Sequence, residues 1–390
     1  MEKKKFIIDN KLVFYTGLIY FIIMALFVVL KILAYFNLFN FSGASYVYKI
    51  IVQIGLMLVL PLVLFSVLCK KSAKQTFDTF SFRKISGKAI FISFALGICL
   101  FILIGYVSSL WSGILSLFGY KFSSASGDYS VLSFVMSVLF VGILPGFCEE
   151  VAHRGLIVGG IKKDGHIRAI VLCGLLFGLM HFNPVQFGYA FVAGMFFSFV
   201  TMISKSIFPA MIMHFTNNTL STIVLFANNS DWFPSNMVDW FNNLFTSGNT
   251  FLIILLNLLI LLITTSILCY LCMKLFVEGK KSQFKRFQKN LEKELKSTEL
   301  EAEINTKDKS QVLQIYEQVN LLNLEKKLKN GTFSLQDLAG EMSTKKTFEL
   351  FLSDNLSLPE KKRASNYIFY YLAIFLGALG TILTFILNIL

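Results

Sequence analysis

Long apolar runs separated by short polar segments dominate this chain. Nine runs are candidates for membrane spans: Leu12–Phe36, Tyr48–Leu68, Ala89–Leu110, Val131–Gly160, Ile167–Phe182, Phe187–Ile203, Phe208–Ala227, Thr250–Met273 and Tyr367–Leu390. A helix needs about 20 apolar residues to cross a hydrocarbon core of roughly 30 Å. The pattern therefore predicts an all-α fold, a polytopic transmembrane bundle of about eight helices followed by a C-terminal transmembrane helix.

The pattern changes after Glu278, where polar and charged residues replace the apolar runs as far as about Asn366. Apolar residues recur there at steps of three and four, as in Phe284, Phe287, Leu291 and Leu295. This stripe is typical of amphipathic helices. We therefore expect 278–366 to be a cytoplasmic helical insert that serves as a spacer, a self-association element, or a docking module for a substrate or regulator.

Composition and charge placement agree with a membrane protein. The chain is 55% hydrophobic and 15% charged, which excludes an ordinary soluble domain. Its net charge of +13 is concentrated in alternate loops, whereas the stretch Asn228–Asn249 has two aspartates and no lysine or arginine. By the positive-inside rule, the N-terminus and the 278–366 segment lie in the cytoplasm. We expect a multi-pass protein of the cell membrane whose basic residues face anionic lipids, and no nucleic-acid partner.

Ionisable residues interrupt three of the apolar runs. Glu149 and Glu150 lie side by side, and Arg154 follows one turn later. His181 and His214 lie in two further apolar segments of a chain that has only four histidines. A charged side chain at membrane depth costs several kcal/mol unless it is paired or functional. These residues are therefore candidates for a functional site.

The candidate residues lie at a similar depth. Glu149 is thirteen residues before Lys162, and His181 is thirteen residues after Arg168, which is roughly 20 Å of helix in each case. Asn218, one turn after His214, is also about 20 Å from Lys205. Because proline cannot continue the helical hydrogen-bond ladder, we expect Pro145-Gly146 to break the helix and open a polar cavity beside a helix start at Glu149.

This set of groups suits amide hydrolysis. A glutamate beside a histidine can hold a water molecule and take its proton during attack on a carbonyl. His214 and Asn218 can both point at the developing oxyanion. We expect Arg154 to pair with Glu150, and His153 and His166 to be bystanders. Cys148 adjoins the glutamates, but the sequence around it has no activated-thiol pattern.

The order and spacing of these residues resemble a known family. Glu149-Glu150-x-x-x-Arg154, then Phe177-x-x-x-His181, then His214-x-x-x-Asn218 is similar to the three-motif signature of the CAAX prenyl endopeptidase and bacteriocin-processing family of intramembrane proteases, also called the CPBP or Abi family. The resemblance covers about Val131 to Ala227. It implies an eight-helix type of bundle with a conical cavity open toward the cytoplasm. It also implies that Glu149 and His181 activate water while His214 and Asn218 stabilise the oxyanion.

The resemblance sets the expected organisation of the chain. We expect a membrane-embedded bundle at 1–277 with the protease core at about 131–227, the cytoplasmic segment at 278–366, and a last transmembrane helix at 367–390. The insert and the last helix depart from the minimal family pattern, and the family says nothing about their role.

Two questions stay open at this point. Glu149, His181 and His214 are one carboxylate and two imidazoles, a set that can hold zinc, whereas the glutamate–water scheme needs no metal. The leading hypothesis is an intramembrane endopeptidase that acts on a peptide or protein, such as a peptide precursor or leader. The alternative is a non-proteolytic immunity factor or peptide-binding scaffold that uses the same cavity. An ion or solute transporter is a weaker third reading, because the chain lacks inverted-repeat symmetry and paired broken helices.

The loop charges predict which segments face the cytoplasm. An impermeant thiol reagent should label Ser235→Cys, but not Ser310→Cys, in intact cells that express an otherwise cysteine-free chain. Quantitative labelling before and after permeabilisation measures this directly. Labelling of Ser310→Cys alone in intact cells would show that the orientation is inverted.

Overall fold

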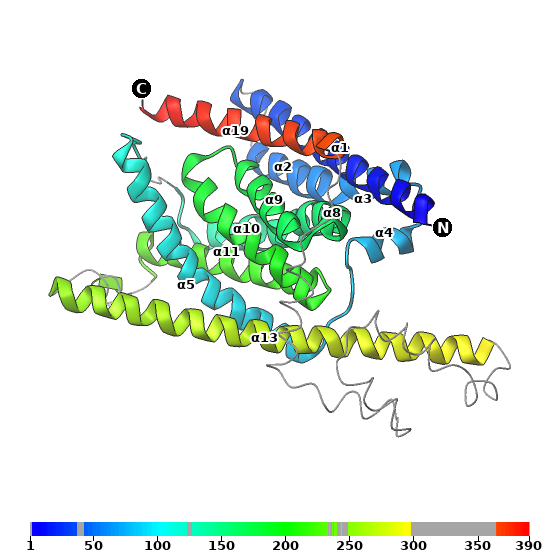
Figure 1. Ribbon diagram of the computed structural model, residues 1–390. Coiled ribbons are helices and arrows are strands. Elements are labelled where there is room, and N and C mark those ends of the chain that lie inside the picture. The colour runs from blue at the N-terminus through cyan, green and yellow to red at the C-terminus, as the bar shows by residue number, and fades with distance from the viewer. Residues whose placement is uncertain are drawn as a thin grey trace.

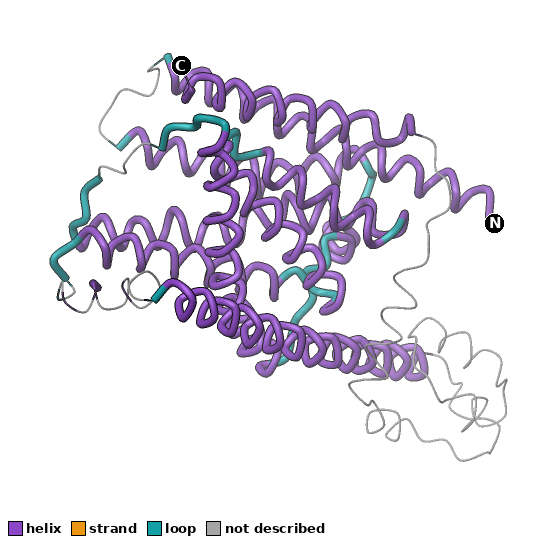
Figure 2. The backbone as a smooth tube through the Cα atoms, turned by 60° about the vertical axis from the view of Figure 1, so that its left-hand side comes forward, coloured by secondary structure: helices purple, strands orange, loops and turns teal. Residues whose placement is uncertain are grey.

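The computed structural model describes residues 2–36, 43–122, 127–232, 249–297 and 364–389, together with 234, 236, 238, 239 and 243. Helices account for nearly all of the regular structure in this described part, which contains no strand (Figure 2). The all-α prediction is therefore confirmed. Most of the predicted insert, 298–363, lies outside the described residues, so its helices stay a prediction.

The described elements are all helical. In chain order they are α1 (Glu2–Tyr35), α2 (Ala44–Ile50), η1 (Ile51–Val59), α3 (Leu60–Leu68), α4 (Ala73–Thr79), α5 (Gly87–Leu117), α6 (Val131–Ser137), η2 (Val138–Ile143), α7 (Leu144–Glu150), η3 (Val151–Val158), α8 (Gly159–Ile161), η4 (Lys162–Asp164), α9 (His166–Leu179), α10 (Pro184–Ser204), α11 (Phe208–Asn229), α13 (Thr250–Ser297), η5 (Ala364–Tyr367) and α19 (Ile368–Ile389). Segments η1, η2 and η3 are π-helical turns inside longer continuous helices.

Seven helices of the described chain are long and apolar enough to cross a membrane. They are Lys11–Tyr35, Ala44–Leu68, Gly87–Leu117, Val131–Asp164, Pro184–Ser204, Thr250–Gln283 and Ile368–Ile389. The other two predicted spans also form helices, but α9 has only 14 residues, and α11 carries polar side chains, including His214 and Asn217, through its middle. The structure confirms a polytopic bundle, in which α9 and α11 lie among longer helices.

The predicted helix break at Pro145-Gly146 is wrong. Helix runs without interruption from Val131 to Asp164, and Glu149 lies near its middle rather than at a helix start. Pro145 lies in the first turn of the α-helical segment α7, between the π-helical segments η2 and η3. The wider π-helical turns accommodate the proline ring without ending the helix.

Two apolar clusters form the interior. The first joins α1, η1, α3, η3, α9 and α19, and the second joins α5, α10, α11 and α13. Helices α10 and α11 contribute to both clusters and so lie between them, near the centre of the molecule in Figure 1. The candidate site lies in this central region.

The C-terminal helix α19 lies alongside α1 and also packs on α9 (Figure 1). Its start is anchored by Tyr367, whose hydroxyl donates to Asp164 Oδ2 over 2.8 Å. Burial raises the pKa of Tyr367 to about 12, so the hydroxyl keeps the proton that it donates. One turn into α19, the Tyr370 hydroxyl donates to Thr16 Oγ1 of α1 over 2.8 Å. Helix α19 is therefore joined to the bundle by buried polar contacts as well as by apolar packing.

Helix α13 is longer than the predicted span. It continues from Thr250 to Ser297 and passes through the expected boundary at residue 277 without interruption. Near this boundary Glu278 Oε2 accepts a hydrogen bond from Ser86 at the start of α5, over 2.8 Å.

Close packing of α19 predicts the effect of adding a methyl group to it. A Cβ at Gly377 would lie 2.7 Å from Leu179 Cβ and 3.3 Å from the Leu179 carbonyl oxygen, so the backbone of one helix must move. We expect Gly377→Ala to lower the free energy of unfolding by about 1–3 kcal/mol. Gly113→Ala is the matched control, because a Cβ there meets nothing within 4 Å. Reversible denaturant unfolding in detergent measures both; equal stability of the two variants would contradict this packing.

Candidate active site

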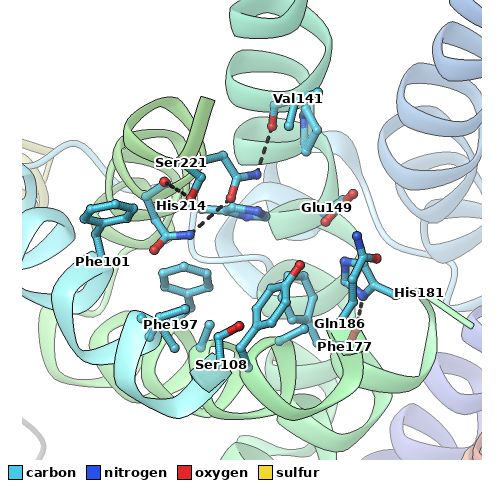
Figure 3. Close-up of a pocket in the computed structure, with 18 of the residues that line it drawn as sticks. Phe101, Ser108, Val141, Glu149, Phe177, His181, Gln186, Phe197, His214 and Ser221 are labelled. Carbon is cyan, nitrogen blue, oxygen red and sulfur yellow. Dashed lines mark hydrogen bonds between the residues drawn. The ribbon is translucent and has the colours of Figure 1, made fainter. Parts of the chain in front are cut away.

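A cavity of about 490 Å³ lies between α5, α7, α10 and α11 (Figure 3). It is lined by Phe101, Ile104, Gly105, Ser108, Phe140, Val141, Pro145, Glu149, Phe177, His181, Gln186, Tyr189, Ala190, Ala193, Phe197, His214, Asn217, Asn218 and Ser221. The four residues predicted to be catalytic, Glu149, His181, His214 and Asn218, all belong to this lining. The structure thus brings them together; their catalytic roles stay predictions.

Glu149 is held by a residue that sequence reasoning missed. Gln53 Nε2 donates to Glu149 Oε1 over 2.8 Å, and both side chains are buried. Gln53 lies in the π-helical segment η1, on a helix outside the three motifs. A lone glutamine in the apolar run Tyr48–Leu68 was the available signal, since a buried amide in such a run needs a polar partner. Gln53 fixes one carboxylate oxygen and leaves Oε2 of Glu149 for other partners.

His181 lies beside Glu149 on one side of the cavity (Figure 3). Its Nδ1 is 2.8 Å from the Phe177 carbonyl oxygen. Because a carbonyl only accepts, Nδ1 carries the proton, and Nε2 of the neutral ring keeps its lone pair. Glu149 and His181 therefore offer two acceptors to a molecule bound between them.

Helices outside the motifs hold the turn that carries His181. This turn joins α9 to α10, and Phe182 within it has a left-handed backbone with φ of 49°. Lys31 Nζ of α1 donates to the His181 carbonyl oxygen over 3.2 Å. Thr384 Oγ1 of α19 donates to the Phe182 carbonyl oxygen over 3.0 Å. The direction of the His181 ring thus depends on both α1 and α19.

His214 faces the cavity from α11 and is tied to Glu150 behind it. His214 Nδ1 lies 2.9 Å from Glu150 Oε1, so this nitrogen donates to the carboxylate. The imidazole also stacks on Phe197, with ring centroids 5.1 Å apart and planes at 22°. Glu150 itself is fully buried and does not line the cavity. Adjacent glutamates therefore face different surroundings, Glu149 the cavity and Glu150 the protein interior.

The predicted ion pair between Arg154 and Glu150 is confirmed. Arg154 Nη1 lies 2.8 Å from Glu150 Oε1, and both side chains have no solvent exposure. Arg154 Nη2 donates to the Gly194 carbonyl of α10 over 2.9 Å. Its guanidinium also lies over Phe177 and Phe197, 4.5 and 5.2 Å from the two ring centroids. Cation–π contacts of this kind strengthen when water is excluded.

Asn218 donates a hydrogen bond to the Val141 carbonyl, which Pro145 leaves without a helical donor. Pro145 has no N–H to donate to the Val141 carbonyl one turn before it, and Asn218 Nδ2 donates to that oxygen over 2.9 Å. Asn217 Nδ2 in turn donates to Asn218 Oδ1 over 3.2 Å. The Asn218 amide is therefore fixed in orientation, with a second N–H still to donate. Asn217, not singled out from the sequence, also lines the cavity.

The remaining candidates lie away from the cavity. His153 is fully buried, with Nδ1 2.7 Å from the Glu149 carbonyl oxygen and Nε2 2.9 Å from the Tyr20 hydroxyl. Since the carbonyl only accepts, Tyr20 donates to Nε2, and the ring links α1 to the glutamate helix. His166 begins α9 at the basic loop. Cys148 is buried, with a 2% exposed fraction, and is not part of the cavity lining.

The predicted alternative of a zinc site formed by Glu149, His181 and His214 does not fit this geometry. Within the described part of the chain, no group of three His, Cys, Asp or Glu side chains is close enough to hold a metal ion. The chemistry below is therefore derived from the side chains alone.

The buried ion pair predicts a large loss of stability when one partner is removed. Arg154→Met keeps an unbranched side chain but removes the guanidinium, which leaves the Glu150 carboxylate buried without its cation. We expect the free energy of unfolding to fall by about 3–5 kcal/mol. The double variant Glu150→Gln/Arg154→Met should recover part of this loss, because no unpaired charge remains. Denaturant titration in detergent provides the measurement.

Arg168→Met is the control for this substitution, because Arg168 contacts Tyr367 through a longer, 3.4 Å hydrogen bond at the helix end. We expect it to have a much smaller effect. Equal losses of stability for Arg154→Met and Arg168→Met, or no recovery in the double variant, would show that an unpaired buried charge is not what destabilises Arg154→Met.

One comparison with known proteins agrees with this geometry. The family model described as Rce1-like, type II CAAX prenyl endopeptidase, matches residues 131–220. No curated protein and no solved structure matches the chain. The matched segment contains all six residues singled out from the sequence: Glu149, Glu150, Arg154, His181, His214 and Asn218. Gln53, Lys31 and Thr384 lie outside it. Over residues 131–220, this chain is therefore similar to the Rce1-like type II CAAX prenyl endopeptidase family.

Proposed function

We propose that the protein is an intramembrane endopeptidase in which Glu149 and His181 activate water for peptide-bond hydrolysis. The observation that carries the proposal is the placement of two proton acceptors, Glu149 and His181, in one cavity with two potential donors, His214 and Asn218. The Rce1-like match supports a CAAX-type protease at a coarse level. The cavity is also of the size that binding sites for small molecules and peptide segments have.

Water activation follows from the two acceptors. A water molecule between Glu149 and His181 donates one hydrogen to the carboxylate and the other to His181 Nε2. Gln53 holds Glu149 Oε1, so Oε2 is the oxygen that takes the proton. As the water oxygen attacks the peptide carbonyl carbon, one proton passes to Glu149, and the carbonyl π bond becomes an oxyanion. A positioned general base of this kind contributes roughly 10²–10⁴-fold in rate.

The opposite wall stabilises the oxyanion. His214 donates from Nδ1 to Glu150, so a ring that takes up a second proton carries it on Nε2. Such a ring donates to the oxyanion from Nε2, and Asn218 donates its second N–H. Both groups are fixed before substrate arrives, through Glu150 and through the Val141 carbonyl. Donors that are already oriented need no reorganisation during the reaction.

Collapse of the tetrahedral intermediate returns the catalyst to its starting state. The C–N bond breaks, and Glu149 gives the proton that it took from water to the departing nitrogen. The products are a new carboxyl group, which carries the water oxygen, and a new amine. Glu149 is again a carboxylate, so no other reactant is required.

The rest of the lining indicates the kind of substrate. The walls present apolar side chains, including Phe101 and Ile104 of α5 and Phe197 of α10. Asn217 Oδ1 is buried and, within the described part of the chain, has no hydrogen-bond partner. A peptide N–H supplies the donor that this oxygen lacks. We therefore propose a peptide or protein substrate that presents an extended segment with apolar side chains.

Replacing the proposed base tests the mechanism. Glu149→Gln keeps the size of the side chain and still accepts from Gln53, but it cannot take a proton from water. We expect cleavage of precursor peptides by the purified protein to fall by at least about 100-fold. Mass spectrometry of the peptide products measures the rate, and thermal unfolding verifies that the variant is folded.

Glu278→Gln is the matched control, because it makes the same change outside the cavity and should leave the rate unchanged. Turnover by folded Glu149→Gln at the rate of the unsubstituted protein would exclude the mechanism. Peptide binding by a protein that cleaves none of the peptides, before or after substitution, would instead favour the immunity-factor or scaffold function.

A further inference from the structure

The turn that carries His181 ends a short helix in the interior of the bundle. Helix α9 has 14 residues, about 21 Å of helix, which is less than the roughly 30 Å of a hydrocarbon core. It begins at the basic loop that contains Lys162 and Lys163, and Arg168 lies in its first turn. From the turn, α10 continues for 21 residues, long enough to cross the membrane. The turn therefore lies on the side of the bundle away from the basic loop.

The exposed part of the cavity lining lies on that same side. Gly105, Val141 and Ser221 are exposed, whereas Glu149 and His214 are 5% and 4% exposed. Ser221 is seven residues beyond His214 on α11, about 10 Å farther from the start of that helix, and Val141 is eight residues before Glu149, about 12 Å farther from Lys162. Helix α11 begins next to Lys205, and the helix that carries Val141 and Glu149 ends at the basic loop of Lys162 and Lys163. The mouth of the cavity is therefore farther from the basic loops than the catalytic groups are.

The mouth has polar and aromatic groups suited to an aqueous boundary. Hydroxyl and amide side chains line it, among them Ser108, Gln186 and Ser221. Trp111, farther along α5, donates from Nε1 to the Pro184 carbonyl over 2.7 Å. Tryptophan is enriched at membrane–water interfaces, and polar groups at membrane depth are tolerated where they line a wet cavity.

We propose that the cavity opens toward the side of the membrane opposite the basic loops, so that substrates reach Glu149 from outside the cytoplasm. By the positive-inside rule the basic loops are cytoplasmic. The substrate is then an exported peptide, or the extracytoplasmic segment of a membrane-anchored protein. This statement about the substrate rests on the proposed protease function. This is the opposite side from the one that the family resemblance implies.

Thiol labelling locates the mouth without reference to cleavage. Ser221→Cys is introduced into the full-length chain, with the native cysteines kept, and intact cells are treated with a charged, impermeant thiol reagent. Peptide mass spectrometry then identifies each labelled cysteine. Lys84→Cys, in a basic loop, reports the other side of the membrane. Native Cys269 is exposed on the apolar helix α13 and reports a thiol that faces lipid.

We expect Ser221→Cys to be labelled in intact cells at least about tenfold faster than Cys269, because a thiol forms the reactive thiolate in water and not in hydrocarbon. Lys84→Cys should be labelled only after permeabilisation. Ser108→Cys serves as the second reporter if Ser221→Cys does not fold. Labelling of the mouth cysteine only after permeabilisation, labelling in neither condition, or labelling of Lys84→Cys in intact cells would each overturn the proposal.

Cleavage assays on the labelled protein separate this proposal from the proposed function. A charged group attached at Ser221→Cys should reduce peptide cleavage about tenfold or more by obstructing the mouth, whereas the same group at Lys84→Cys should not. Undiminished cleavage after complete labelling at the mouth would count against this route of entry. If the unlabelled protein cleaves no peptide, the proposed protease function fails, and the labelling pattern alone still decides on which side the cavity opens.

Discussion

The site depends on the burial of one arginine. Arg154 has no solvent exposure, and its charge is balanced by Glu150 and by the faces of two phenylalanine rings. A charge in such a place is tolerable only if its partners are fixed, because each unpaired ion costs several kcal/mol in the interior. Glu150 in turn fixes His214. The ion pair therefore orders α7, α10 and α11 around the cavity, although neither of its members lines it.

Adjacent glutamates meet different surroundings because a helix directs them to different sides. Successive residues on a helix project about 100° apart, so Glu149 and Glu150 cannot share one environment. Glu150 meets the guanidinium and imidazole of the interior, and Glu149 meets Gln53 and the cavity. The side chain that is charge-paired gives structure, and the side chain that accepts a single hydrogen bond remains available for chemistry.

Helices beyond the matched 131–220 segment contribute to the site through contacts with its backbone and side chains. Gln53 holds Glu149, while Lys31 and Thr384 hold the turn of His181. Three π-helical segments also border the site, and π-helical turns are frequent at functional sites because they displace side chains and free backbone groups. The last helix, which the family pattern does not explain, thus belongs to the same packed unit as the candidate catalytic residues.

The sequence by itself determined the class of the fold and singled out four residues that the structure brings together in one cavity. Apolar runs of span length require helices in lipid, since every backbone group there must be paired within its own segment. Glu149, His181, His214 and Asn218 stood out because polar side chains are rare and costly in such runs. Helical rise alone placed them at one depth, and the ion pair between Glu150 and Arg154 followed from their spacing of one turn.

Only the tertiary structure decided what those residues contact. Periodicity does not specify which helix faces which, so the roles of Gln53, Lys31 and Thr384, far away in sequence, could not be predicted. The expected break at Pro145 failed for a similar reason: a proline removes one hydrogen bond, but whether the helix ends there depends on neighbours that satisfy the freed carbonyl, here Asn218 of α11. The direction in which the cavity opens likewise depends on how a short helix packs among longer ones. Local sequence determines which polar groups have a free-energy cost of burial, and packing between distant segments supplies the partners that offset this cost.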